Sequence, residues 1–324
     1  MKLNSLIISA ALFCSLAFAA SASAQKAAGG EAQPGNERTV TAAESVNVTV
    51  STGTGKIIVH GWDRQEVRAR VEDEDARVEL RNTDGANGTG PALRVEVLVS
   101  DSADEEPQYG VSIASADVQV DVPRGATVYL KTQDGDIEVD GVAEARIETI
   151  DGEIEVVRVA KAIDATSVGG DMTVENSAGR VRLNSIGGSI SAREIRSTEP
   201  SDFLKAKTVS GDLTLDRIGQ THVETNTISG EVRLNGPLAR GGSYDFTTTT
   251  GDITLAIPND SSFKINARVS EGGEIITEFP LHYKSEGPPA ASILQSGRLS
   301  GSFGTGDATI NLISFSGTVR LRRK

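Results

Sequence analysis

The stretch TQDGDIEV (132–139) opens a short phrase that recurs along the middle of this 324-residue chain. Each copy holds a hydroxyl residue, two variable residues and a glycine, usually followed by an acid and then by alternating apolar and polar positions. The further copies are TIDGEIEV (149–156), SVGGDMTV (167–174), SIGGSISA (185–192), TVSGDLTL (208–215), TISGEVRL (227–234) and TTTGDITL (248–255). Successive copies begin 17 to 23 residues apart, which indicates a repeat architecture.

The positions two and four residues after each glycine are usually apolar, as Ile137 and Val139 are in the first copy. Residues two apart lie on the same face of a strand, so these positions predict a buried face. A repeat of this length accommodates two or three strands with tight corners, and it leaves no room for a crossover helix. The sequence therefore predicts an all-β fold, a parallel β-solenoid (β-helix) of about 18–22-residue coils with the glycine at a corner.

The segments that flank this array repeat the pattern less regularly. Residues 39–127 contain alternating segments and another copy of the phrase, TGTGKIIV (52–59), and they predict an atypical β-rich N-terminal cap. Solenoid repeats are expected over 128–324, with looser C-terminal coils after Pro258. The segment EFPLHYKSEGPPAAS (278–292) is predicted to be a surface loop or an edge excursion, because proline cannot donate to a central ladder.

The N-terminus has the features of a secretory signal peptide. A cationic Lys2, an apolar run over 6–20 and small residues ending at Ala24 predict cleavage after residue 24. A transmembrane anchor is disfavoured because the run is shorter than the roughly 20 residues that span a bilayer. Residues 25–38 are predicted to be a flexible leader. We therefore expect an exported protein, in the periplasm, at the cell surface or outside the cell, with no membrane span.

Composition excludes several kinds of chemistry. Cys14 is the only cysteine and lies within the predicted signal peptide, so disulfides, thiolate catalysis and cysteine metal ligands are not expected in the mature chain. The formal net charge is −13, and removal of Lys2 with the signal peptide would make it −14. Such a balance repels phosphate backbones, so no nucleic-acid partner is expected.

Two sets of polar residues would form columns if the coils stack in register. The acids that follow the glycines could bind calcium, but Ser189 interrupts them and no calcium-binding nonapeptide is present, so a solvated acidic edge without a metal is the favoured interpretation. The hydroxyl residues could form an ice-binding or sugar-binding face, but hydrogen bonds to the corner backbone are favoured. The acids are Asp136, Glu153, Asp171, Asp212, Glu231 and Asp252, and the hydroxyl residues are Thr132, Thr149, Ser167, Ser185, Thr208, Thr227 and Thr248.

Isolated residues give no sign of an active site. His60, His222 and His282 lie in different segments without metal-ligand spacing. Trp62, the only tryptophan, is expected to plug the end of the core rather than to stack on a sugar. The sequence GTGK (53–56) lacks the frame of a phosphate-binding loop. No catalytic, cofactor-binding or metal-binding residue is therefore predicted.

The repeats resemble the DUF4097 family of bacterial β-strand repeat proteins. The resemblance covers roughly residues 45–324 and includes Gly304, Gly306 and Ile310 before a final Ser316–Leu321 segment. It implies an exported solenoid, with adhesive or envelope-associated roles proposed for the family and no catalytic residue to carry over. We expect a non-catalytic structural or adhesive module that presents a repetitive polar surface to an envelope or surface partner, protein or glycan. The alternatives are a polysaccharide-binding or polysaccharide-cleaving β-helix protein, and an accessory of envelope-stress sensing.

Overall fold

The computed structural model describes residues 36–73, 75–84, 90–100, 114–282 and 297–324. These residues belong to one of two structural units, Pro34–Lys324. All regular structure among them is β-strand, which confirms the all-β prediction, and no helix that could span a membrane occurs in this part of the chain. The predicted signal peptide (1–24) and most of the predicted leader (25–38) lie outside the described residues.

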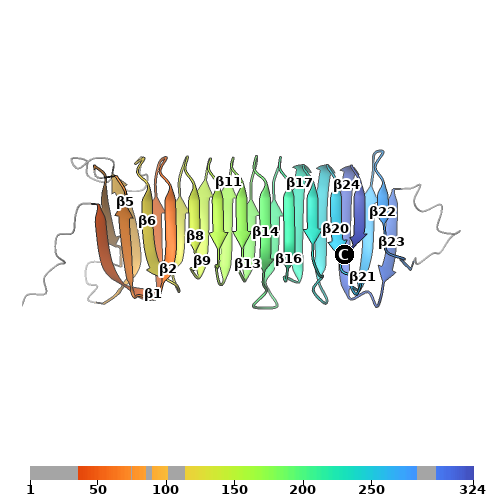
Figure 1. Cartoon of the computed structure of the whole chain (residues 1–324), viewed down its shortest axis with the longest axis horizontal. Helices are drawn as coiled ribbons and strands as arrows, with labels where there is room; N and C mark the ends of the chain where they lie inside the picture. Colours follow the sequence, from red (N-terminus) through yellow and green to blue (C-terminus); the bar gives the residue numbers. More distant parts are fainter. Residues whose placement is uncertain (1–35, 74, 85–89, 101–113, 283–296) are drawn as a thin grey trace, which may run out of the picture. The chain divides into compact units, whose positions relative to one another are not determined.

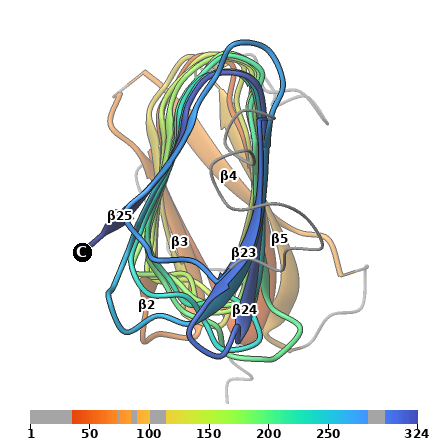
Figure 2. The same cartoon turned by 90° about the vertical axis from the view of Figure 1, so that its right-hand side faces the viewer.

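The strands are arranged in two sheets that face each other along the unit (Figures 1 and 2). Sheet A contains, in spatial order, the first part of β1 (Glu37–Ser51), β3 (Glu66–Val71), β6 (Val118–Pro123), β2 (Ile57–Trp62), β8 (Ile137–Asp140), β10 (Ile154–Val157), β12 (Met172–Glu175), β14 (Ile190–Ile195), β16 (Leu213–Ile218), β18 (Val232–Asn235), β20 (Ile253–Ile257), β25 (Val319–Arg323) and β22 (Ile275–Thr277).

Sheet B is built in the same way from the remaining strands. It contains, in spatial order, β4 (Arg77–Asn82), β5 (Ala92–Ser100), the second part of β1, β7 (Thr127–Lys131), β9 (Glu144–Thr149), β11 (Ala162–Ser167), β13 (Arg180–Asn184), β15 (Phe203–Lys207), β17 (His222–Ser229), β19 (Ser243–Thr250), β24 (Ala308–Ser316), β21 (Phe263–Val269) and β23 (Arg298–Phe303).

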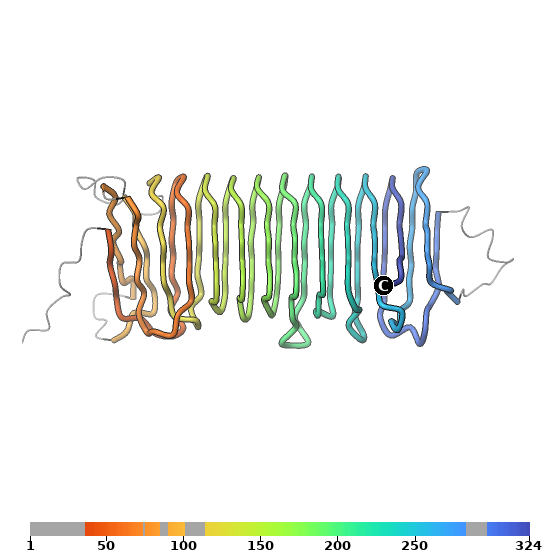
Figure 3. The backbone as a smooth tube through the Cα atoms, viewed as in Figure 1, coloured from red at the N-terminus to blue at the C-terminus, as the bar shows by residue number. Residues whose placement is uncertain are grey.

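Each regular coil consists of one strand from sheet B, a corner, and one strand from sheet A (Figure 3). The corner carries the hydroxyl and glycine residues of the sequence phrase, and we call it the hydroxyl corner. Neighbouring coils pair in parallel with equivalent residues opposite each other, so that Ile137, Ile154, Met172 and Ile190 form one row. Because the register is constant, every position of the phrase becomes a column along the unit.

The core consists of apolar rows between the two sheets, because alternate residues of each strand point inward. Small and large side chains occur in the same row. Ala206 and Phe246, for example, occupy equivalent buried positions on either side of Thr225. The apolar positions singled out in the sequence, such as Ile137, Val139 and Leu255, are all buried. Stacking of coils therefore buries side chains that no single coil could cover.

The order of the coils differs from the order of the chain at both ends. The coil formed by β1 and β2 lies between β5–β6 and β7–β8. The coil formed by β24 and β25 lies between β19–β20 and β21–β22. The chain therefore forms β21 and β22 at the end of the array first, and its last segment is then inserted between them and β19–β20. Among the described residues, antiparallel pairing involves β3 and β4 near one end of the array and β23 near the other. All other strand pairs described in the two sheets are parallel.

One sequence-based expectation near the ends is wrong, and one of the two alternatives for residues 278–292 is contradicted. Trp62 does not plug the core: its indole is partly exposed and donates to the carbonyl of Glu66 at 2.9 Å. The guanidinium groups of Arg64 and Arg68 each lie 4.9 Å from the centroid of its ring. The start of the proline-rich segment is not a surface loop, because Phe279 and Leu281 are buried in the core, and the alternative of an edge excursion is not contradicted. Residues 283–292 of that segment lie outside the described residues.

Candidate functional site

The hydroxyl side chains of the corner bond to the backbone, as the sequence predicts, and they point inward, which it did not predict. All seven are buried. Thr208 donates to the carbonyl of Gly188 at 3.0 Å, Thr227 to that of Gly211 at 3.3 Å and Thr248 to that of Gly230 at 3.2 Å, in each case in the neighbouring coil. Since the hydroxyl column is buried, it cannot present an exposed ice-binding or sugar-binding face.

The glycines of the corner are required mainly by close approach of neighbouring coils. A Cβ added to Gly188, Gly211 or Gly230 would overlap the carbonyl oxygen of the equivalent glycine in the preceding coil. Gly170 combines the same overlap, here with Gly152, with a positive φ of 75°. Coils therefore stack at normal ladder spacing only if this position lacks a side chain.

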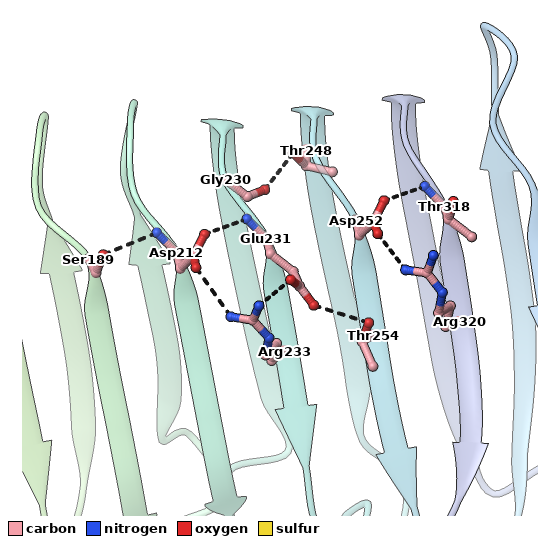
Figure 4. Close-up of polar contacts among 10 residues, drawn as sticks. All are labelled: Ser189, Asp212, Gly230, Glu231, Arg233, Thr248, Asp252, Thr254, Thr318 and Arg320. Carbon is pink, nitrogen blue, oxygen red and sulfur yellow. Dashed lines mark hydrogen bonds and ion pairs between the residues drawn. The ribbon is translucent and has the colours of Figure 1, made fainter.

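The acids of the corner form the predicted column, and all four of its aspartates have a structural role that the sequence did not reveal. The amide of Glu153 donates to Asp136 at 2.9 Å, that of Ser189 to Asp171 at 2.8 Å and that of Glu231 to Asp212 at 2.8 Å. The amide of Thr318 donates to Asp252 at 2.7 Å in the same way (Figure 4). A short carboxylate thus caps an amide of the next coil, which ties the corners together.

Arginines of sheet A neutralise part of this column. Arg233 contacts both Asp212, at 3.2 Å, and Glu231, while Arg320 contacts Asp252 (Figure 4). Burial alone would raise the pKa of Asp252, but the amide of Thr318 and the guanidinium of Arg320 hold the pKa below its ordinary value. No group of three or more His, Cys, Asp or Glu side chains suited to a metal ion occurs in the part of the chain that the structure describes.

The corner also exposes a row of apolar side chains, which the sequence interpretation missed. The residue that follows the hydroxyl is Ile150, Val168, Ile186, Val209 or Ile228 in five successive coils, and each is 41% to 56% exposed. The backbone carbonyls of these residues accept hydrogen bonds from the next coil. For example, the amide of Gly169 donates to the carbonyl of Ile150, and the amide of Gly187 donates to that of Val168. We call these five residues the apolar row. The sequence did contain a signal for this row, because the position after the hydroxyl residue is isoleucine or valine in each of these five copies of the phrase.

The outer face of sheet B carries a second feature, a shallow groove of about 180 Å³. Glu144 and Arg146 of β9 line one side of it, and Arg180, Arg182 and Phe203 of β13 and β15 line the other. Aromatic and basic side chains therefore meet at a depression of the surface. These residues come from distant parts of the sequence, so no local motif could have indicated the groove.

The histidines do not assemble into a site. His60 lines a hollow on sheet A beside Glu138 and Asp140, His222 lies on sheet B, and His282 pairs with Ser302 near the C-terminal end of the array. The GTGK residues form a hydroxyl corner, in which Thr52 donates to the carbonyl of Gly55 at 3.0 Å. This corner is one more copy of the repeat, in agreement with the register of β2 and β8.

The stacked coils and their repeated corners define a β-strand repeat protein. A family model described as "Toastrack DUF4097" matches residues 36–322, and the chain belongs to this family. A search of curated proteins finds no match.

Three solved structures resemble the chain at low identity. A "putative adhesin" from Parabacteroides merdae is 9% identical with a TM-score of 0.43, and the match covers 88% of this chain and 95% of that one. A "putative adhesin" from Parabacteroides distasonis is 11% identical with a TM-score of 0.32, covering 88% and 95%. A "putative cell adhesion protein" from Clostridium sporogenes is 9% identical with a TM-score of 0.23, covering 89% and 99%.

Proposed function

We propose that this protein is a non-catalytic adhesive or structural module of the bacterial cell envelope. It is exported by its signal peptide and presents its repetitive surface to a partner in the envelope or at the cell surface. Residues 39–127 act as an atypical cap on a parallel β-solenoid, and neither a metal nor a cofactor takes part. Membership of the family and the adhesin descriptions of its structural neighbours support this proposal.

The observation that carries the proposal is the apolar row. Burial of an isoleucine or valine side chain stabilises a protein by about 1.5–3 kcal/mol, yet five successive coils leave such residues half exposed. Scattered apolar residues on a surface need no explanation, whereas an aligned series indicates an interaction surface. The hydroxyls and glycines beside the row already account for the stability of the corner.

A polysaccharide-cleaving enzyme is the weaker alternative. A glycoside hydrolase needs two carboxyl groups that are free to act on the glycosidic bond. Two acids, Glu144 and Asp164, line the groove on sheet B, but Asp164 forms an ion pair with Arg182 at 3.2 Å. A polysaccharide-binding role is compatible with that groove.

Cosedimentation of the purified chain with envelopes of the bacterium that produces it tests the proposal. The combined variant Val168→Thr, Ile186→Thr, Val209→Thr removes apolar surface from the row while keeping β-branched side chains. We expect the wild-type chain to cosediment and this variant to bind about tenfold more weakly.

The matched control is the combined variant Leu93→Thr, Ile276→Thr, Ile313→Thr, since these residues are exposed and apolar but lie outside the row. It should bind like the wild type. A wild-type chain that does not cosediment, or equal binding by a folded row variant, contradicts the proposal.

A further inference from the structure

A straight row of side chains crosses the outer face of sheet B. Tyr129, Arg146, Asp164, Arg182 and Lys205 are paired in register on β7, β9, β11, β13 and β15. Aromatic rings lie near both ends of this row. The Arg146 guanidinium lies 5.1 Å from the ring centroid of Tyr129, and that of Arg182 lies 5.7 Å from the centroid of Phe203.

The groove in this face exists because one side chain is short. Ala162 of β11 lies opposite Glu144 on one side and Arg180 on the other, and its methyl group leaves a depression between them. Arg146 and Arg182 border the same depression. Long polar side chains therefore surround a small floor from both sides.

The arginines of the groove are incompletely neutralised. Arg182 pairs with Asp164 at 3.2 Å, whereas Arg146 and Arg180 make no ion pair within the described residues. Arg180 acts on Asp202 only at longer range. Three arginines and two acids, Glu144 and Asp164, line the groove, so its lining carries an excess of positive charge. In a chain with a net charge of −13, this local excess indicates a site for an external anion.

The longest spacing between copies of the phrase provides the aromatic wall. Residues 196–202 form a loop between β14 and β15, and Phe203 follows it directly. The buried Asp202 accepts hydrogen bonds from the amides of Thr198, at 2.7 Å, and Glu199, at 2.8 Å. Asp202 thus holds the loop and positions Phe203 on the outer face, where the equivalent residue of the next coil is His222.

We propose that this groove binds an acidic polysaccharide. Carboxylates on the sugar residues pair with Arg146, Arg180 and Arg182, because a guanidinium matches the geometry of a carboxylate. The apolar face of a pyranose ring lies against Phe203, and Tyr129 offers a similar surface further along the row. Glu144 accepts hydrogen bonds from sugar hydroxyls. An acidic peptide would satisfy the arginines but has no pyranose ring whose apolar face could lie against Phe203.

The groove would give the proposed adhesive module a glycan partner. The biological role of the groove therefore rests on the proposed adhesive function. The groove is physically separate from the apolar row, which lies at the corner. Polysaccharide binding without cosedimentation would contradict the proposed function alone, and cosedimentation that survives loss of the groove arginines would leave that function intact.

Titration calorimetry of the purified chain at physiological ionic strength tests the site with three probes. Polygalacturonate carries carboxylates on pyranose rings, poly-glutamate carries carboxylates without rings, and galactan carries rings without charge. We expect polygalacturonate to bind about tenfold more tightly than either of the others. Poly-glutamate binding as tightly as polygalacturonate would overturn the proposal in favour of an acidic peptide, and no binding of polygalacturonate would overturn it outright.

Variants locate the binding on the molecule. Arg146→Gln with Arg182→Gln should weaken polygalacturonate binding about tenfold or more, while Arg193→Gln with Arg233→Gln removes equal charge from sheet A and should change little. Phe203→Leu keeps an apolar side chain and should weaken polygalacturonate binding without affecting poly-glutamate. Equal losses in both arginine pairs, in variants that melt like the wild type, would show a non-specific charge effect and contradict the site.

Discussion

The backbone amide of Thr318 donates a hydrogen bond of 2.7 Å to the carboxylate of Asp252, which lies 66 residues earlier in the chain. The contact repeats the amide capping seen between regular neighbours such as Asp212 and Glu231, although β21 and β22 intervene in the sequence. The coil formed by β24 and β25 is therefore held by the same interaction as the central coils. Carboxylate–amide bonds, glycine contacts and buried hydroxyl bonds in this array can be tested separately.

The carboxylate of Asp252 should stabilise the fold in a pH-dependent way. Its pKa in the folded protein lies below the ordinary 3.8, so its contribution is present above that pH and is lost as the pH falls through the lowered pKa. We expect Asp252→Asn to lower stability by about 1 kcal/mol near neutral pH. In thermal melts, the difference from the wild type should vanish under strongly acidic conditions. Glu153→Gln, which removes a column acid that caps no amide in the described residues, should have little effect at either pH.

Glycine substitutions should separate the effect of close approach from that of a positive φ. Gly241 has a φ of 70° and open space around its Cα, whereas Gly170 has a φ of 75° and faces the carbonyl of Gly152. Gly241→Ala should cost about 1 kcal/mol. Gly170→Ala should cost on the order of 3 kcal/mol, since the coils must also move apart. Equal costs in urea titrations would show that the spacing between coils does not require this glycine.

Gly170→Val should cost at least as much as Gly170→Ala and should act locally. Coils touch only their neighbours, so hydrogen exchange should accelerate first in residues 149–192. The matched control is Gly90→Val, because Gly90 has open space and no positive φ. Uniform loss of protection along the array would contradict nearest-neighbour stacking. Gly85 lies in the segment NTDGANGTG (82–90), which contains no copy of the phrase, so the sequence also suggests it as a control. It lies outside the described residues.

Two threonines on β17 should respond in opposite directions to the same substitution. Thr225 and Thr227 are equally buried, but among the described residues the hydroxyl of Thr225 has no hydrogen-bond partner, while that of Thr227 donates to the carbonyl of Gly211. Thr225→Val should raise the free energy of unfolding by about 1 kcal/mol, because an unsatisfied polar group leaves the core. Thr227→Val should lower it by about 1 kcal/mol. Denaturant unfolding of both variants measures the difference, and a loss of stability in Thr225→Val would contradict the assignment.

Removal of the returning segment should detach the end of the array. A chain that ends at residue 297 lacks β23, β24 and β25, which provide all the strand partners of β21 and β22. We expect hydrogen exchange to become fast over residues 263–277 and to change little over 137–192. A chain that lacks only Arg323 and Lys324 serves as the control. Retained protection of β21 in the shorter chain would show that the inserted coil is not needed there.

Local sequence patterns are enough to specify the repeating unit. Glycine and hydroxyl residues at fixed positions specify the corner, and alternating apolar residues such as Ile137 and Val139 specify the buried face, because both depend on local backbone geometry. The hydrogen bonds of the hydroxyl column to the corner backbone follow from the same geometry, as Thr208 shows with the carbonyl of Gly188.

The way in which the units meet depends on contacts between distant segments of the chain. The return of β24 and β25 inside the array depends on pairing between segments far apart in the chain, which no local pattern encodes. The same holds for the groove, where Arg146, Arg182 and Phe203 come together through stacking. Trp62 was misplaced for this reason, since Arg64 and Arg68 cover it only once β2 and β3 are in position. Short-range geometry fixes a coil, whereas the free energy of contacts between coils fixes their order and the surfaces they share.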